Sequence, residues 1–313
     1  LTCDYYYRYT NKMLASVALP GAGAISGFVK QWRNAAALSN EGLELLVKYE
    51  IFRTPDLYWK ISVNGARNWN KLRETSDGRD LIGVIGRSIN DIKVLKTEGF
   101  IDYQDDIPAY WRADGYKAYL NQNPTSYYKP GDYKYVDLNG DGTIDGKDVI
   151  YVGSALPIFS GGLVSEFKWK DFDINLSMAY QMGRHMINAM PISSLQQNEG
   201  VLLYDARKIT FWNQPGDNAD YPFAAQATVV DRDVEKVNWL KLKTLTIGYS
   251  LPKAWMAKVG LKQVRFFASG ENLLTFSNYS GLDPETVDIR TGYDGGRNYP
   301  LARKFTLGLT VKF

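Results

Sequence analysis

Apolar and polar residues alternate strictly along the last nine positions of the chain. The odd positions are all apolar, namely Phe305, Leu307, Leu309, Val311 and Phe313. Threonine, glycine and lysine fill the even positions. A period of two places successive side chains on opposite faces of an extended chain. Residues 305–313 are therefore predicted to form a β-strand with one apolar face and one polar face.

Such a strand has two interpretations. In a soluble sheet, the apolar face packs against a protein core. In an outer-membrane β-barrel, the apolar face contacts lipid and the polar face lines the lumen. A single strand does not distinguish these possibilities, so the remaining strands must decide between them.

The same alternation recurs upstream, and it predicts about eight strands in all. The seven further segments are residues 1–10, 43–51, 59–66, 163–169, 172–181, 244–251 and 264–276. Their connections alternate between long and short. The short connections are residues 53–56, 170–171 and roughly 252–262. The long connections are a Gly- and Ala-rich stretch that runs through Asn40, and residues 71–159, 183–238 and 277–302. This strict asymmetry is typical of transmembrane barrels, which have short periplasmic turns and long extracellular loops.

Charged residues occupy the polar faces of the predicted strands: Glu44, Lys48, Glu166, Lys168 and Asp173. A sheet buried on both faces would exclude them, whereas a water-filled or plug-filled lumen accepts them. Aromatic residues near strand ends fit interfacial girdles, namely Tyr9, Trp59, Trp169, Trp239 and Tyr249. The predicted fold is all-β, an antiparallel transmembrane β-barrel with long extracellular loops.

The composition excludes some classes of function but does not identify one. The mean hydropathy is −0.31, and no run approaches the roughly 18–20 apolar residues of a membrane helix. The net charge is +3 without a basic block, which argues against nucleic acid as a partner. Cys3 is the only cysteine, so no internal disulfide can form, and His185 is the only histidine, so no multi-histidine metal site can form.

An Asp- and Gly-rich motif at 137–148 lies inside the longest predicted loop. It matches the EF-hand type of loop, which places oxygen ligands at positions 1, 3, 5, 7, 9 and 12 and glycine at position 6. The predicted ligands are Asp137, Asn139, Asp141, the carbonyl of Thr143, Asp145 and Asp148, with Gly142 at the turn. We predict a structural Ca²⁺ ion here, or Mg²⁺, because the last ligand is the shorter Asp in place of Glu. The alternative is a surface turn that binds no ion.

Several segments resemble the SusC/RagA group of TonB-dependent outer-membrane transporters. They are Tyr128–Asp145, Ser160–Leu163, Lys170–Asp173, Leu240–Pro252, Ser269–Leu274 and Tyr279–Glu285, together with the Phe313 ending. They occur in the family's order, and the resemblance covers nearly the whole chain.

The resemblance implies a barrel of about 22 strands that is filled by an N-terminal plug. Residues 1–313 would form the C-terminal part of that barrel, with the plug, the TonB-contacting segment and the signal peptide upstream. The implied function is TonB-dependent import of a glycan oligosaccharide or peptide across the bacterial outer membrane. The implied partners are a SusD-like surface lipoprotein that acts as a lid, TonB and membrane lipid.

Two other functions stay open at this stage: an outer-membrane barrel enzyme, and a soluble calcium-binding β-sandwich adhesin. We find no catalytic constellation, and we predict that the chain is not an enzyme. Loop aromatics could either contact substrate or pack the loops: Tyr103, Tyr110, Trp111, Tyr116, Tyr127, Tyr128, Trp212, Tyr221 and Tyr293. No substrate-binding residue is assigned from the sequence.

Overall fold

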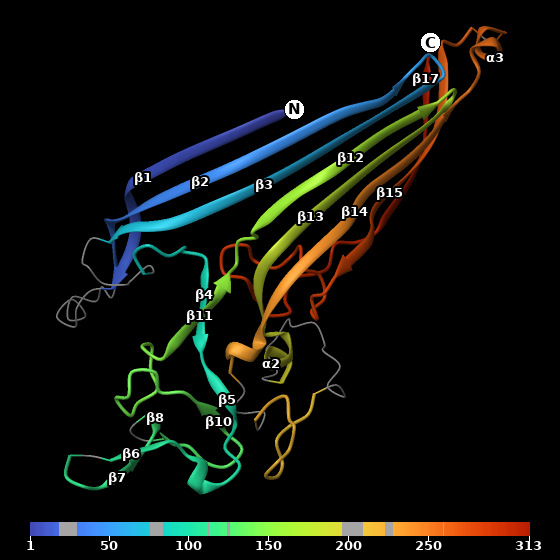
Figure 1. The fold of residues 1–313 in the computed structure, drawn as a ribbon. Coiled ribbons are helices and arrows are strands. Elements are labelled where there is room, and N and C mark those ends of the chain that lie inside the picture. The colour runs from blue at the N-terminus through green and yellow to red at the C-terminus, as the bar shows by residue number, and fades with distance from the viewer. Residues whose placement is uncertain are drawn as a thin grey trace.

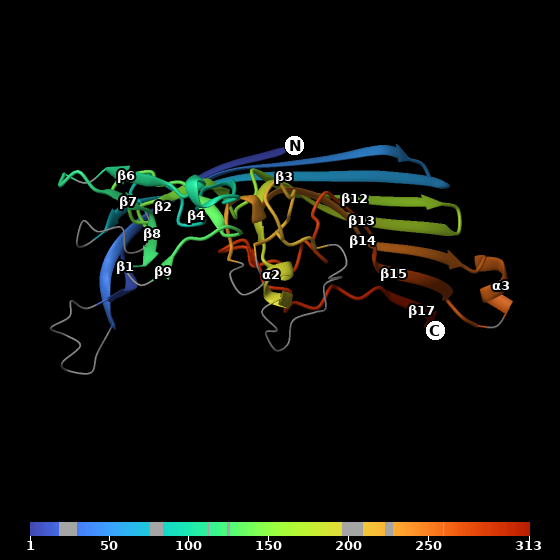
Figure 2. The same ribbon diagram turned by 90° about the horizontal axis from the view of Figure 1, so that it is seen from below.

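The computed structural model describes residues 1–18, 30–75, 84–111, 113–123, 126–195, 209–222, 228–258 and 260–313. Eight long strands form one antiparallel sheet, in the order β1-β2-β3-β12-β13-β14-β15-β17. Their bounds are β1 Thr2–Ala18, β2 Lys30–Arg53, β3 Leu57–Thr75, β12 Phe159–Trp169, β13 Phe172–Asn188, β14 Val234–Ser250, β15 Gln263–Ser277 and β17 Lys304–Lys312. Figure 2 shows that these strands fan out into one curved wall. The predicted number of strands and their antiparallel arrangement are confirmed.

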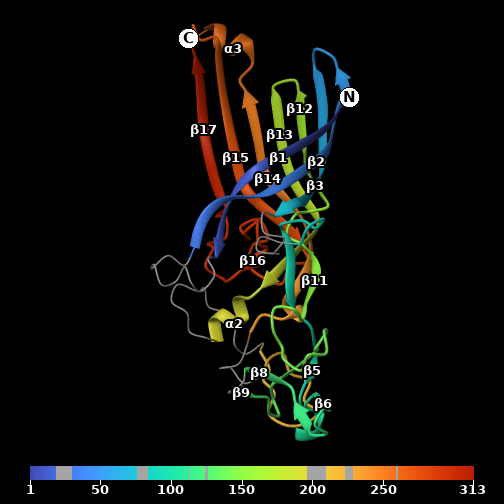
Figure 3. The same ribbon diagram turned by 90° about the vertical axis from the view of Figure 1, so that its left-hand side faces the viewer.

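All of the predicted short connections lie at one end of the sheet. The turns after β2 and β12, and the short helix α3 (Lys253–Lys258), lie at the same end of the sheet as the C-terminus, at the top of Figures 1 and 3. The connections between β3 and β12 and between β13 and β14 extend from the opposite end. The predicted alternation of short and long connections is therefore confirmed for the described chain.

The register separates an apolar face from a polar face. One row across the sheet reads Phe52, Trp59, Phe167, Ile174, Ile247, Ala268 and Leu307. The adjacent row reads Glu50, Lys60, Glu166, Asn175, Thr246, Ser269 and Thr306. Because a strand turns alternate residues to opposite sides, these rows belong to opposite faces of the sheet.

The apolar face has no covering layer among the described residues. Leu307 is 85% exposed and Ile247 is 47% exposed. The other sheets of the described chain are two-stranded and belong to the connection between β3 and β12. A soluble β-sandwich would bury this face against a second sheet, so that alternative is not the fold.

Charges on the polar face are paired across neighbouring strands. Lys60 Nζ lies 3.2 Å from Glu166 Oε1, and Arg265 Nε donates to Asp173 Oδ1 at 2.9 Å. The Arg265 guanidinium also lies over the Phe267 ring, 5.3 Å from its centroid. The predicted polar placement of Glu166 and Asp173 is thus confirmed.

Hydrophobic clusters are found in the long connections and where those connections meet the sheet. The connection from β3 to β12 contains β4 Asp91–Leu95, β5 Thr97–Phe100, η1 Gln104–Asp106, β6 Ala109–Trp111, β7 Lys117–Tyr119, β8 Asn121–Asn123, β9 Ser126–Tyr127, β10 Tyr133–Tyr135 and β11 Val149–Ser154. The later connections contain α2 Met190–Leu195, η4 Asp231–Asp233 and β16 Tyr293–Asp294. None of the described helices is long and apolar enough to cross a membrane.

One predicted connection is partly a strand. Residues 30–40 were assigned to the Gly- and Ala-rich connection, but they form the first half of β2. Ala35, Ala36 and Ala37 are buried there, as are Leu38 and Ser39. Their small side chains do not alternate between apolar and polar, so the pattern gave no sign of a strand. The glycine-rich stretch 20–24 lies outside the described residues.

Candidate functional site

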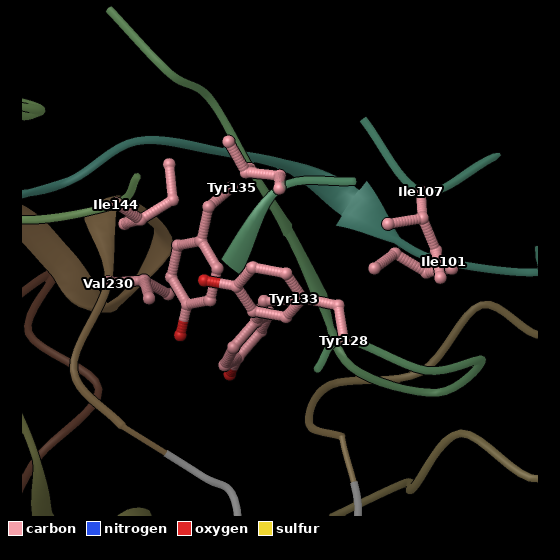
Figure 4. Packing of buried hydrophobic residues seen from close by; sticks show 8 residues of the cluster. Ile101, Ile107, Tyr128, Tyr133, Tyr135, Ile144 and Val230 are labelled. Carbon is pink, nitrogen blue, oxygen red and sulfur yellow. The ribbon is translucent and has the colours of Figure 1, made fainter. Parts of the chain in front are cut away.

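A cluster of tyrosines forms the core of the loop that carries the Asp- and Gly-rich motif. Tyr128, Tyr133 and Tyr135 are at most 6% exposed and pack with Ile101 and Val230. Figure 4 shows their rings beside Ile144, the apolar residue at position 8 of the motif. The motif is therefore attached to the loop core through its own apolar side chain.

The motif loop has the backbone turn that its sequence predicts. Gly142 has a φ of +80°, in the left-handed region that favours glycine. A Cβ atom at Gly142 would lie 2.1 Å from the end of the exposed Tyr110 side chain, which would have to move. Asp137 Oδ1 accepts from Gly140 N at 2.7 Å, and its Oδ2 accepts from Gly142 N at 2.8 Å.

Three further predicted ligands, Asp148, Asn139 and Asp141, also accept hydrogen bonds from backbone donors. Asp148 is fully buried, and its two oxygens accept from the backbone N–H groups of Leu138 and Asp145, each at 2.9 Å. Asn139 Oδ1 accepts from Asp141 N at 2.8 Å. Thr143, the predicted carbonyl ligand, donates its N–H to Asp141 Oδ1 at 3.0 Å.

In this arrangement, a lysine lies beside the motif carboxylates. Lys147 Nζ lies 3.4 Å from Asp141 Oδ2 and 3.9 Å from Asp145 Oδ2. Among the described residues, no three Asp, Glu, His or Cys side chains converge to hold a metal ion. The donor types of the motif fit a hard cation, but the six predicted ligands are not drawn together, so the metal site stays a prediction.

The connection from β15 to β17, residues 278–303, is anchored on the polar face of the sheet. Arg184 of β13 is 1% exposed, and its guanidinium donates to the carbonyls of Val287 at 3.0 Å and Asp288 at 2.7 Å. β16 also pairs in parallel with the end of β13. Both contacts hold the backbone of the connection, which fixes its path.

Four charged side chains reinforce that anchor. Lys241 of β14 is 1% exposed, and its Nζ lies 2.6 Å from Asp283 Oδ1 and 2.9 Å from Glu285 Oε2. Lys243 Nζ lies 2.8 Å from the other Glu285 oxygen. Burial opposes ionisation of Asp283, but the hydrogen bonds from Lys241 and from backbone N–H groups outweigh burial and lower its pKa. We call this group the ionic cluster.

Residues of α2 line two cavities. The acidic cavity, of about 210 Å³, is lined by Asn188, Pro191, Ile209, Asp220, Tyr221, Arg232, Asp233, Glu235 and Ser280. The second, of about 490 Å³, is lined by Ile192, Ser193, Thr228, Val229, Tyr293, Gly295, Arg297 and Asn298. Both belong to the end of the sheet that carries the long connections, so they are candidate ligand sites.

Asp233 in the acidic cavity makes the local stability depend on pH. Burial raises its pKa from 3.8 to about 6, against the opposing effect of the hydrogen bond from Val230 N. The folded state therefore holds the proton more tightly than the unfolded state. The resulting stabilisation is complete below pH 3.8 and is lost as the pH rises to about 6. At 1.36 kcal/mol per pKa unit, the loss is about 3 kcal/mol.

We expect residues 228–234 to exchange amide hydrogens less readily at pH 4.5 than at pH 7, after correction for intrinsic exchange rates. In Asp233→Asn, which has no carboxyl group to ionise, this difference should disappear. An unchanged pH dependence in the variant would assign the effect to another group.

The structure separates the loop aromatics into two groups. Tyr128, Trp212 and Tyr221 are buried in loop packing, whereas others are exposed, namely Tyr103, Tyr110, Trp111, Tyr116 and Tyr293. The side chain of Tyr127 lies outside the described residues. The exposed group is available to a ligand or partner at the surface, and Tyr221 also lines the acidic cavity.

The assignment of Trp239 to an interfacial girdle was wrong. Trp239 is 5% exposed and packs with Met186, Val237, Tyr279 and Val287. It lies in the register row of Gln181, on the polar face, where the connection 278–303 covers it. The sequence could not show this cover, because the covering residues lie about 40 positions away.

The ionic cluster was missed from the sequence, although both of its halves lie in the segments that carried the family resemblance. Lys241 and Lys243 belong to Leu240–Pro252, and Asp283 and Glu285 belong to Tyr279–Glu285. The structure brings these two segments into contact. The Nδ1 atom of His185 is buried without a hydrogen-bond partner in the described chain.

Comparison with known proteins supports the class that the fold defines. No family model matches the chain. It is 29% identical to TonB-dependent receptor P3 of Formosa agariphila over an alignment of 333 residues. That alignment covers 100% of this chain and 32% of the receptor. It is 26% identical over 317 residues to TonB-dependent receptor SusC of Bacteroides thetaiotaomicron, and this alignment covers 99% of the present chain and 30% of SusC. The chain thus spans about a third of these relatives.

The solved structure of the RagAB peptide transporter matches with a TM-score of 0.71 and 25% identity, over 99% of this chain and 33% of that one. The chain is therefore a segment of an outer-membrane β-barrel. Within that class, these similarities confirm the resemblance to the SusC/RagA group of TonB-dependent transporters. The relatives are receptors and transporters, which points away from catalysis.

Proposed function

We propose that this chain is the C-terminal part of a transporter barrel that imports a nutrient across the outer membrane with energy supplied through TonB. The observation that carries the proposal is the similarity to TonB-dependent receptors along the whole chain. The exposed apolar face and the paired charges of the opposite face support it physically, since lipid accepts the first and a lumen accepts the second.

We further propose that the imported nutrient is a glycan oligosaccharide or a peptide, and that a SusD-like surface lipoprotein binds over the long connections. One similar solved structure is described as a peptide transporter, which supports the peptide class, and the glycan class follows from the resemblance of the sequence to the SusC/RagA group. The exposed loop aromatics suit either class, because aromatic rings stack on sugars and pack against peptide side chains.

The test is uptake by the intact transporter that contains this chain. Cells with the transporter and its lid should accumulate labelled oligosaccharide or peptide. Deletion of TonB should reduce uptake to background while surface binding persists. Uptake that continues at the same rate without TonB would contradict the proposal.

We also propose that the motif loop binds Ca²⁺ or Mg²⁺ as a structural ion. The ligands would be Asp137, Asn139, Asp141, the Thr143 carbonyl, Asp145 and Asp148. The positive φ of Gly142 and the complete burial of Asp148 support the proposal, since the EF-hand type of loop needs a sharp turn at position 6 and a fixed last ligand.

Replacing Asp137 and Asp141 together by Ala should abolish ion binding and loosen residues 128–150 without unfolding the barrel. Bound calcium can be measured by elemental analysis, and loop order by hydrogen exchange. An unchanged ion content in the double variant would refute the ligand assignment. Asp217→Ala, a change in another exposed loop, is the control.

A further inference from the structure

The second cavity beside α2 contains a cationic side chain that has no counter-charge in the described chain. Arg297 lines this cavity of about 490 Å³. Its guanidinium makes no hydrogen bond or ion pair with any part of the chain that the structure describes. None of the cavity's described lining residues is acidic. An unpaired guanidinium in a concave polar site favours an anionic ligand.

The backbone on each side of Arg297 is held in place. Ala189 N donates to the Asp294 carbonyl at 2.9 Å, and Asn298 Nδ2 donates to the Thr286 carbonyl at 2.8 Å. The nearest acidic residue along the chain, Asp294, is 6% exposed and accepts from Tyr279 Oη at 2.7 Å and from Gly296 N at 2.9 Å. The Asp294 carboxylate is thus already hydrogen-bonded to other groups, and the backbone that carries Arg297 is held in a fixed position.

The remaining lining residues suit an organic ligand. Ser193 and Thr228 contribute hydroxyl groups, and Asn298 contributes an amide. Tyr293 is 45% exposed and offers an aromatic surface against which an apolar or sugar group can pack. Among the described lining residues, Arg297 alone carries a charge, which matches a group with one negative charge. The flat fork of a guanidinium matches a carboxylate, which it can bind through two parallel hydrogen bonds.

We propose that this cavity is a subsite for a carboxylate group on the ligand, and that Arg297 is a specificity-determining residue. The proposal rests on the proposed function, because it takes the ligand to be a nutrient that reaches the long connections. Two nutrient sources carry such a group: the C-terminus of a peptide and a uronic acid residue of an acidic glycan. The acidic cavity is lined by Asp220, Asp233 and Glu235 with a single cation, Arg232, so it suits the same group less well.

The test is binding to the intact purified transporter that contains this chain, measured by calorimetry. Each probe is paired with a form that lacks the negative charge. The peptide probe is pentaalanine with a free C-terminus, compared with its C-terminal amide. The glycan probe is a galacturonate oligomer, compared with its methyl ester.

We expect at least one charged probe to bind about tenfold or more tightly than its neutral partner, as loss of a charge-assisted hydrogen bond predicts. Arg297→Gln should remove that preference. Arg290→Gln, a change of an exposed arginine on the same connection that lines neither cavity, should retain it. A preference for the free peptide assigns the peptide source, and a preference for the galacturonate oligomer assigns the glycan source.

Equal binding of charged and neutral probes by the unaltered transporter would overturn the proposal, as would a preference that survives Arg297→Gln. Both outcomes are independent of energy coupling, because binding is measured without TonB. Failure of the subsite and failure of the transport function are therefore distinguishable.

Discussion

Replacing Lys241 by Met should release the connection between β15 and β17 from the sheet. Lys241 is buried against Asp283 and Glu285. Met fills a similar volume but leaves the Asp283 carboxylate buried without its cation. Breaking a buried pair by removing one partner costs about 3–5 kcal/mol. The amides of Glu285 and Leu301, which donate to Asp283, should then exchange hydrogen some hundred-fold to a thousand-fold faster.

The matched control is Lys304→Met. Lys304 Nζ lies 3.4 Å from Glu271 Oε1, and the two side chains are 66% and 44% exposed. Exposed pairs contribute at most about 1 kcal/mol, so exchange of the same amides should change little. Exchange in Lys241→Met that stays within threefold of the unaltered protein would show that the ionic cluster does not hold the connection.

Replacing Leu307 by Arg should impair insertion of the barrel into lipid. Leu307 is 85% exposed and shares its register row with Ala268 and Ile247 on the apolar face. An arginine on the lipid face of a β-barrel costs about 2–4 kcal/mol at the bilayer midplane and less near the interfaces. The folded fraction after refolding of the intact transporter into vesicles, measured by heat-modified gel mobility, should therefore fall.

The adjacent residue provides the control for this prediction. Thr306→Arg introduces the same charge one position away, on the polar face beside Ser269. A lumen accepts that charge, so insertion should stay near the unaltered level. Equal loss of insertion in the two variants would mean that the two faces of the strand have the same surroundings, which would contradict the prediction.

Alternation predicted the strands well wherever one register persisted. β12 and the start of β13 pair without interruption, and their predicted limits lie close to those observed. Prediction of β14 failed before residue 244, because a register irregularity between Leu242 and Thr244 changes which face each side chain occupies. A period-two pattern cannot continue across such a shift.

The sites were harder to predict than the strands. The motif loop was recognisable because its residues are close together in the sequence and its glycine is required by the turn. The ionic cluster and both cavities combine residues that lie tens to more than a hundred positions apart, such as Ser193 with Arg297. Such contacts depend on how the long connections fold back onto the sheet, which no local pattern determines.

The central claim is that hydrocarbon contacts the apolar face of β17 and of its neighbours. It can be tested with nitroxide labels placed singly at positions 305–312 of the intact transporter in lipid vesicles, after Cys3→Ser. Odd positions should collide often with lipid-soluble oxygen and rarely with a water-soluble nickel complex, and even positions should show the reverse. Labels at odd positions that are shielded from both reagents would place that face inside protein and contradict the membrane-spanning barrel.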